Sequence, residues 1–366
     1  MNSLASRMPL EYRLAWARDP NCGCLAFVAG ERGIGTRMVS FRRRWKDPLT
    51  PWLEMRIGRR LYMVRRAAII YRENVPFSRW RHVNGKTVHV TSDKAASARI
   101  LRAAGCSVAP FRSFRPTERE EARAYFESTG TEACLKPVHG WAGLNVFPAI
   151  RDRSEFDRAF DVIAASGDDV FVERHLTGDI VRFIFVGGRL VGTRIVRPCA
   201  VTGDGRSTVA ELIAAENAWI LQRDVPSWGT IAVPLQEPAV LERQGLGLSS
   251  VPAAGRRVPL SLVSNVSKGG RSIGEPPDVH PSYALEAKRA ADAFPGLAIT
   301  ALDVMVADYG KPAAADNHWI LDVNSAPGIA TFHFVHEGRP AEVADAVMDW
   351  LLAGGPTRRT GSEMTP

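Results

Sequence analysis

Apolar and polar positions alternate most regularly near the C-terminal end of the chain, in residues 302–306 and again in residues 319–324. A period of two predicts β-strands, because successive side chains of a strand point to opposite faces. Asp303 therefore lies on one face of the first strand, and Asp322 and Asn324 lie together on one face of the second. If the two strands are neighbours in a sheet, the three polar side chains meet at one point.

These three side chains are candidate ligands of a metal ion. Two carboxylates and one amide oxygen, with no His or Cys nearby, suit Mg²⁺ or Mn²⁺. Such an incomplete set of protein ligands leaves coordination positions for phosphate oxygens and water. The alternative is a surface hairpin with solvated Asp side chains, and the two strands alone leave both interpretations open.

Earlier in the chain, apolar positions recur at helical spacing or in short runs. The helical spacing predicts helices over about residues 95–105, 118–128, 154–165 and 341–352. Ser92 or Asp93 is a suitable cap for the first of these helices. Short apolar runs predict strands at residues 133–137, 170–173, 180–186 and 190–196, with a turn at Gly187–Gly188 between the last two.

Lys136 lies near the end of one predicted strand and precedes a loop that contains Gly140 and Gly143. A phosphate site needs a point charge and a backbone that can approach the oxygens without interference from Cβ atoms. The loop lacks the Gly-Lys-Ser/Thr sequence of a Walker A motif. A phosphate-binding loop and a simple hairpin explain this pattern about equally well.

Glu173 closes the strand predicted at residues 170–173, and a short linker through Leu176 follows it. An acidic residue in this position fits a hinge that contacts the amine edge of an adenine ring, with the backbone of Leu176 making the paired contact. The alternative is a solvated strand end, which is the commoner environment of a lone Glu.

The composition is that of a globular protein. With 366 residues, 45% hydrophobic and 23% charged, the chain can bury a large core and form two or three domains. We find no run of eighteen apolar residues and no apolar signal core near Met1, so we expect neither a membrane span nor export, and we expect a cytoplasmic protein. Five cysteines without a CxxC pair argue against a disulfide framework and against structural zinc. Cys22 and Cys24 are expected to serve as small apolar residues of the core.

Positive charge is concentrated in the first quarter of the chain. The net charge is +8, whereas residues 1–90 hold 18 Lys and Arg against 6 Asp and Glu, a balance of +12 that leaves −4 for the rest. The clusters Arg42–Arg44, Arg59–Arg60 and Arg65–Arg66 could attract an acidic partner. No nucleic-acid-binding motif accompanies them, so a solvated arginine-rich face is favoured and a nucleic-acid partner is not expected.

The motifs, taken in order, resemble one known superfamily. Lys94, Lys136 with its glycine loop, Glu173 before a hinge, and Asp303 with residues 322–324 are similar to the corresponding motifs of ATP-grasp carboxylate–amine ligases. Within that superfamily the likeness is greatest to the ATP-grasp module of cyanophycin synthetase. Four further stretches carry it, residues 202–213, 241–257, 264–270 and 324–328, and the motifs together cover roughly residues 85–352.

The resemblance implies an α+β ATP-grasp fold, in which two α+β lobes enclose ATP, preceded by a smaller N-terminal α/β domain. We expect the N-terminal basic domain over residues 1–90 and the ATP-grasp domain over residues 91–352. The small lobe would cover about residues 91–175 and the large lobe about 176–352. Residues 353–366 are polar and are expected to form a disordered tail.

The resemblance also implies roles for individual residues. ATP would be bound by Lys94, Lys136, Gly140, Gly143, Glu173, Leu176 and Asp179, the last replacing the acid for which this chain has Ile180. The metal ligands would be Asp303, Asp322 and Asn324, where Asp322 stands in place of the usual Glu. The substrate would contact Asn265, Ser267, Gly269 and Gly270, and the catalytic residues would be Arg182 and Lys136.

The implied activity is ATP-dependent formation of an amide bond through an acyl phosphate, with Mg²⁺ or Mn²⁺, on an amino acid or peptide. A glutathione-synthetase-like or natural-product dipeptide ligase remains an alternative, as does a non-catalytic nucleotide-sensing module. Cyanophycin synthetase continues into a Mur-ligase-like domain, so we expect this chain to perform at most one of its two ligations. The expected partners are small-molecule substrates, with a homo-oligomer as an open alternative, and the N-terminal arginines would steer an acidic substrate.

Overall fold

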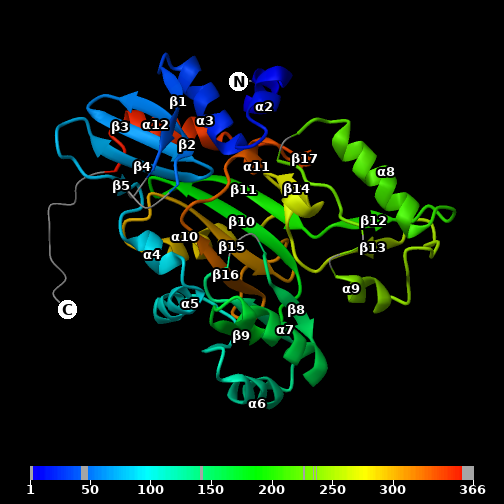
Figure 1. Ribbon diagram of the computed structural model, residues 1–366. Helices are drawn as coiled ribbons and strands as arrows, with labels where there is room; N and C mark the ends of the chain where they lie inside the picture. Colours follow the sequence, from blue (N-terminus) through cyan, green and yellow to red (C-terminus); the bar gives the residue numbers. More distant parts are fainter. Residues whose placement is uncertain are drawn as a thin grey trace.

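The computed structural model describes residues 3–42, 48–140, 143–225, 227–233, 235 and 237–356 (Figure 1). A six-stranded sheet, called the central sheet below, lies in the middle. Its strands, in spatial order, are β16 (His318–Asn324), β15 (Ile299–Val306), β10 (Asp179–Val186), β11 (Arg189–Arg197), β14 (Arg271–Gly274) and β17 (Glu337–Gly338). Only the pair of β14 with β17 is parallel.

The two faces of the central sheet are covered by different parts of the chain. One face carries Val181, Phe183 and Val304 and packs against α10 (Ser282–Asp292). The other face carries Ile184, Val186 and Ile299 and packs against the N-terminal region, α11 (Ala330–His333) and α12 (Val343–Leu352). Strand alternation therefore fills both faces with apolar side chains at one end of the strands.

The N-terminal region is a group of helices on an antiparallel meander. Its elements are α1 (Leu4–Arg7), α2 (Leu10–Ala15), α3 (Pro20–Glu31), β1 (Thr36–Phe41), β2 (Thr50–Ile57), β3 (Arg60–Arg65), β4 (Ala68–Glu73), β5 (Arg81–His82) and α4 (Thr87–Thr91). The core that holds α3 against β3 continues without a break into α12 and the central sheet. Asn84 is fully buried at this junction and forms hydrogen bonds with the backbone of Ala298, Ile299 and Ser325.

The two arginines of one predicted cluster differ in their surroundings. Arg59 is exposed, whereas Arg60 forms an ion pair with Glu73 at 3.0 Å. Residues 43–47, which include part of the first cluster, lie outside the described residues. Steering of an acidic substrate by these arginines therefore stays a prediction.

In Figure 1 a small lobe lies below the central sheet, whereas the N-terminal region lies above it. Its four strands, in spatial order, are β6 (Phe111–Phe114), β9 (Val170–Arg174), β7 (Ala133–Pro137) and β8 (Phe147–Ile150). Its helices are α6 (Arg119–Thr129) and α7 (Arg153–Ala165), and α5 (Lys94–Ala103) connects it to the rest. The Asp93 side chain accepts a hydrogen bond from the backbone of Ala96 and so caps α5, as predicted.

A side subdomain projects from the far edge of the central sheet. It consists of β12 (Ala200–Thr202), α8 (Val209–Leu221), α9 (Pro238–Glu242) and β13 (Arg257–Pro259), and it has a hydrophobic cluster of its own. A capping box between Thr208 and Glu211 begins α8. The helical and strand spacing did not predict these elements. A 3₁₀ turn (Val266–Lys268) then leads into β14.

The helices and strands predicted from apolar spacing are confirmed to within a few residues at each end. The chain after α12 differs from the prediction, because residues 353–356 form a hydrogen-bonded turn in which Gly355 is buried, so the predicted tail does not begin at residue 353. Residues 357–366 lie outside the described residues. Within the described part, no helix is long and apolar enough to cross a membrane.

His333 makes the stability of this fold depend on pH. It is 1% exposed, and its Nε2 accepts a hydrogen bond from the backbone of Ala344 at 2.9 Å. Burial and the nearby Arg7 lower the pKa of His333 to about 3. An unfolded His has a pKa near 6.5, so between these values the unfolded chain binds a proton that the folded chain does not. The contribution of His333 to stability is therefore complete above the unfolded pKa and is lost as the pH falls toward the folded pKa.

We expect His333 to lower the free energy of unfolding by about 2 kcal/mol between pH 6.5 and pH 5. Urea unfolding at a series of pH values would measure this change. His333→Gln should remove this part of the pH dependence, whereas His89→Gln, at an exposed position of α4, should leave it in place. An unchanged pH profile in His333→Gln would show that another group carries the effect.

Candidate functional site

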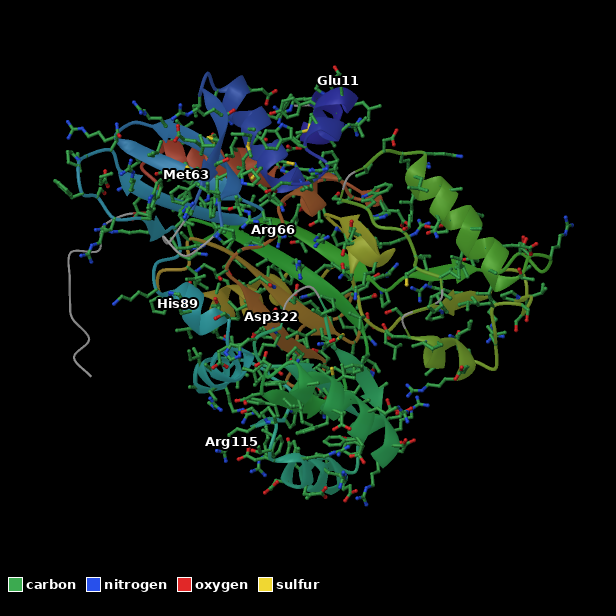
Figure 2. All side chains as sticks on the ribbon, viewed as in Figure 1. Glu11, Met63, Arg66, His89, Arg115 and Asp322 are labelled. Atoms are coloured by element: carbon green, nitrogen blue, oxygen red, sulfur yellow. The ribbon has the colours of Figure 1, made fainter. Side chains whose placement is uncertain are left out.

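Four charged side chains form a row across the face of the central sheet that also packs against the N-terminal region. Arg194 of β11 lies directly opposite Arg182 of β10, Arg182 lies opposite Asp303 of β15, and Asp303 lies opposite Asp322 of β16. Residues directly opposite in antiparallel strands share a face, so these four side chains form one row, called the charged row below. Figure 2 shows Asp322 near the centre of the molecule, between the N-terminal region and the small lobe.

Two β-bulges build the charged row. The register of β10 with β11 shifts between Ile184 and Phe185, and this shift brings Arg194 opposite Arg182. The register of β15 with β16 shifts after Asp303, and this shift brings Asp322 opposite Asp303. A bulge re-aims the side chains that follow it, and bulges are frequent beside active sites.

The predicted metal ligands come together in this row. The Asn324 amide donates a hydrogen bond to Oδ2 of Asp303 at 3.3 Å, and Asp303 also pairs through both carboxylate oxygens with Arg182. Within the described ranges, no three His, Cys, Asp or Glu side chains gather into a metal-binding group. The predicted set contains only two carboxylates and an amide, which fits a hard cation that completes its coordination with phosphate oxygens and water.

Arg194 is a residue of this site that the sequence did not single out. It is 3% exposed, and within the described part of the chain its guanidinium forms one hydrogen bond, to the carbonyl of Thr331, which is long at 3.5 Å. Burial and the neighbouring Arg182 lower the pKa of Arg194 to about 9. Among the described residues, its Nε has no hydrogen-bond partner. The single negative charge of Asp303 therefore does not compensate both guanidinium groups of the charged row, those of Arg182 and Arg194.

Lys136 and Glu173 form a buried ion pair on the facing small lobe. Their Nζ and Oε1 atoms are 2.6 Å apart, and each side chain is at most 10% exposed. Burial acts to lower the pKa of Lys136, but attraction to Glu173 and, more weakly, to Asp322 of the opposite lobe raises it overall. The lysine is therefore charged and lies within electrostatic reach of the charged row.

The glycine loop and the loop at residues 265–270 meet at the mouth of the site. Lys94 donates a hydrogen bond to the carbonyl of Gly140. A methyl group added at Gly143, whose φ is +66°, would lie 2.8 Å from a methyl of Val263 and 4.0 Å from the amide nitrogen of Asn265. Only glycine allows this approach, so the two loops can close against each other.

The four predicted substrate residues are not equally accessible. The Asn265 carboxamide accepts hydrogen bonds from the backbone and the hydroxyl of Ser267, and Ser267 is exposed. Gly269 and Gly270 are buried beneath this turn, where a methyl group at Gly270 would collide with the carbonyls of Asn265 and Arg197. The structure therefore presents Ser267 to a ligand and uses the two glycines to shape the turn.

Asp179 does not join the predicted nucleotide residues. It lies three positions before Arg182 on β10, so its side chain points to the other face of the central sheet, where it forms an ion pair with Arg197 at 3.2 Å. Ile180 takes the position on the face of the charged row. The ribose contact of Asp179 therefore stays a prediction that this conformation does not favour, because a shift of one residue reverses the face.

The linker after Glu173 offers a donor for a base. Leu176 is 8% exposed, and within the described part of the chain its backbone N–H has no hydrogen-bond partner. Buried N–H groups are rarely left unpaired, so this one suits a ligand acceptor. The predicted adenine contact therefore has a free donor in the expected place.

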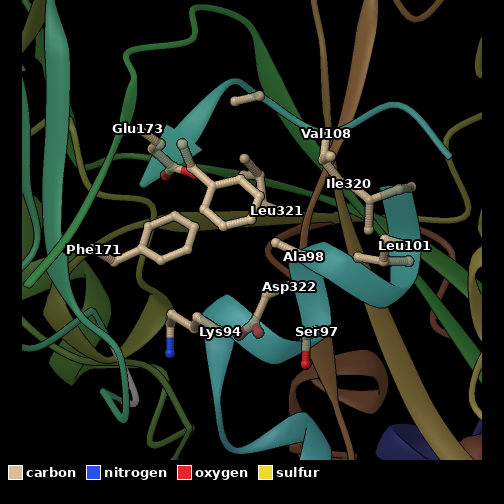
Figure 3. Close-up of a pocket in the computed structure, with 12 residues that line it drawn as sticks. Lys94, Ser97, Ala98, Leu101, Val108, Phe171, Glu173, Ile320, Leu321 and Asp322 are labelled. Atoms are coloured by element: carbon tan, nitrogen blue, oxygen red, sulfur yellow. The ribbon is translucent and has the colours of Figure 1, made fainter. Parts of the chain in front are cut away.

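The space between Lys94, Glu173 and Asp322 is nearly closed (Figure 3). The cavity lined by these residues and by Phe171 and Leu321 has a volume of about 10 Å³, which is that of a single water molecule. A nucleotide does not fit into this cavity, so binding in this position requires the small lobe to move away from the central sheet. Movement about the linker after β9 would provide this opening.

The fold and the arrangement of these residues define the class of the protein. The crystal structure of a bifunctional glutathione synthetase from Pasteurella multocida matches the chain with a TM-score of 0.58 and 25% identity, covering 92% of this chain and 44% of that one. The predicted α+β ATP-grasp fold is confirmed, and the chain belongs to the ATP-grasp superfamily. No protein-family model matches the chain.

Sequence relatives give a narrower likeness. Cyanophycin synthetase of Nostoc sp. is 32% identical over 273 residues, which are 72% of this chain and 29% of that protein. The bifunctional glutathione biosynthesis protein of Mannheimia succiniciproducens is 30% identical over 270 residues, which are 72% of this chain and 35% of that protein. The chain thus spans about a third of the length of these curated relatives.

Proposed function

We propose that the chain is an ATP-dependent carboxylate–amine ligase that forms an amide bond on an amino acid or peptide. The observation that carries this proposal is the charged row, in which Asp303 and Asp322, with Asn324 beside them, face the buried Lys136 of the small lobe. Carboxylates for a cation and a lysine for phosphate oxygens, drawn from two lobes, are what phosphoryl transfer requires. The names of the relatives, a cyanophycin synthetase and a bifunctional glutathione biosynthesis protein, support the same activity.

The residues of the chain have separate tasks in this proposal. The Leu176 N–H and Glu173 hold the base, while Lys94 and Lys136 hold phosphate oxygens of ATP. Asp303, Asp322 and Asn324 hold Mg²⁺, which supplies Lewis-acid neutralisation of phosphate charge. Their nearly closed environment keeps water away from a reactive acyl group.

Two arginines would act on the substrate. Arg182 lies in the middle of the charged row and has a planar guanidinium that can bind a carboxylate or an oxyanion through two hydrogen bonds. Arg194 adds a second guanidinium next to it, which forms no ion pair with a carboxylate among the described residues. The positive charges of the two arginines would therefore stabilise a substrate carboxylate at the position where the phosphoryl group is transferred.

An acyl phosphate intermediate can be tested by trapping. The chain is incubated with ATP, Mg²⁺, hydroxylamine and a panel of amino acids and short peptides, without a second amine. We expect an acyl hydroxamate to accumulate together with ADP, because hydroxylamine attacks an activated carboxyl group. A phosphorylated protein without hydroxamate would contradict the proposed order of steps.

The substrate pair distinguishes the proposed ligase from its alternatives. A glutathione-synthetase-like activity is favoured to a similar degree by the relatives, because their identities of 30% and 32% hardly differ. ADP release over single amino acids, dipeptides and acidic peptides, with the product mass measured, separates a dipeptide ligase from polymer extension. ATP binding without any ADP release would favour a nucleotide-sensing module.

A further inference from the structure

A second pocket lies at the far edge of the central sheet, between β11, β14 and the side subdomain. Its volume is about 570 Å³, within the usual range for pockets that bind small molecules. The side chains used below line it, namely Arg197, Glu216, Trp219, Arg257, Arg271 and Glu337. We call it the edge pocket.

The edge pocket is separate from the charged row. Arg197 lies three positions after Arg194 on β11, so the two side chains point to opposite faces of the sheet. Arg271 of β14 lies directly opposite Arg197 and shares its face. A ligand in the edge pocket therefore contacts the face of the sheet that does not carry Arg182 and Asp303.

One cation of the edge pocket has no partner. Arg271 is held by Glu216 at 2.7 Å and by Glu337 at 3.4 Å, and Arg197 is held by Asp179 from below the pocket. Arg257 of β13 is exposed and, among the residues that the structure describes, forms no hydrogen bond or ion pair. Three guanidinium groups and two carboxylates line the pocket, but Asp179 outside the lining neutralises Arg197, so the cation that is left for a ligand carboxylate is Arg257.

Trp219 forms a flat apolar wall of the edge pocket that is held in place by stacking. Its ring is parallel to that of Trp228 at 5.6 Å, and Trp228 stacks on His336 at 3.9 Å. The guanidinium of Arg223 lies 3.7 Å from the centre of the Trp219 ring. The guanidinium of Arg271 also lies over this ring, 4.9 Å from its centre, so the ring is fixed in the pocket wall and a ligand would contact the part of it that these groups leave exposed.

We propose that the edge pocket binds an acidic amino acid or short peptide with a net charge of −1. A ligand carboxylate would pair with Arg257, the ligand ammonium group would face Glu216 and Glu337, and the ligand body would lie on Trp219. The ligand carboxylate complements Arg257, the cation that the described residues leave without a carboxylate partner. This inference goes beyond the proposed ligase activity, because the site is on the other face of the sheet and needs no ATP.

Calorimetry with the full chain, without ATP, tests this proposal. The probes are L-alanyl-L-aspartate, with a net charge of −1, and the neutral L-alanyl-L-asparagine. We expect the acidic dipeptide to bind, and Arg257→Gln to weaken its binding about tenfold or more, because a charged hydrogen-bonded pair is lost. Arg256→Gln is the matched control, since its exposed neighbouring guanidinium turns away to the carbonyl of Gln244. Circular dichroism would verify that both variants are folded.

Several results would overturn the proposal. Equal weakening by Arg256→Gln and Arg257→Gln would reduce it to general surface attraction, and equal affinity for the two dipeptides would remove the requirement for an acidic ligand. Loss of binding in Arg182→Gln with retention in Arg257→Gln would place the dipeptide at the charged row. Absence of binding at millimolar dipeptide would show that the pocket has no such ligand. If binding is confirmed but no ligation is found, only the proposed function fails.

Discussion

Asp322→Asn is expected to lower metal-dependent ATP turnover about 10³-fold while the chain stays folded. The substitution keeps the shape of the side chain but removes a negative charge from the point where Asp303 and Asn324 meet. A metal ion at a transferring phosphoryl group contributes several kcal/mol, and each 1.36 kcal/mol corresponds to a factor of ten in rate. ADP release at saturating ATP with varied Mg²⁺ would measure the loss.

The control for this variant is Asp308→Asn. Asp308 lies in the loop that follows β15 and pairs at the surface with Lys311, so its replacement should leave turnover within about twofold of the parent chain. Normal turnover by folded Asp322→Asn would remove Asp322 from the metal site. Equal losses in both variants would indicate that negative charge on this part of the chain matters in general.

Lys136→Met is expected to destabilise the chain by about 3–5 kcal/mol and to lower turnover about 10²–10³-fold. The loss of stability arises because Glu173, 2.6 Å away and buried, would be left without its positive partner. The loss of turnover arises because a charge near the transferring phosphate is removed. Urea unfolding and ADP release measure the two effects separately.

A double variant separates the structural role of Lys136 from its chemical role. Lys136→Met combined with Glu173→Gln removes both buried charges, so most of the lost stability should return. Turnover should stay low, because no cation has been restored at the phosphate. If turnover returns together with stability, Lys136 serves only to neutralise Glu173.

Local alternation was sufficient to predict the strands of the site. It was not sufficient to predict the register in which these strands pair. The turn at Gly187–Gly188 implies that Arg182 lies opposite Thr193, whereas the β-bulge between Ile184 and Phe185 places Arg194 there. A bulge depends on packing between strands and leaves no mark in apolar spacing. The sequence therefore contained Arg194 without any signal that it belongs to the site.

The same reasoning applies to two of the predicted nucleotide-binding residues. The search for an acid near the family position chose Asp179, although a displacement of one residue on a strand reverses the face. Glu173 was assigned to the base alone, but its pairing with Lys136 depends on the antiparallel contact of β9 with β7. Pairings between distant segments are what a single sequence reveals least.

The position of Asn84 has a consequence for how the chain can be divided. This side chain forms four hydrogen bonds with the backbone of the central sheet and the segment that follows β16, and the surrounding core joins α3 to α12. A cut near the proposed boundary at residue 90 would expose that core on both fragments. We therefore expect residues 1–90 to unfold together with the central sheet, and a chain cut back to the ATP-grasp motifs to be less stable than the 366-residue chain.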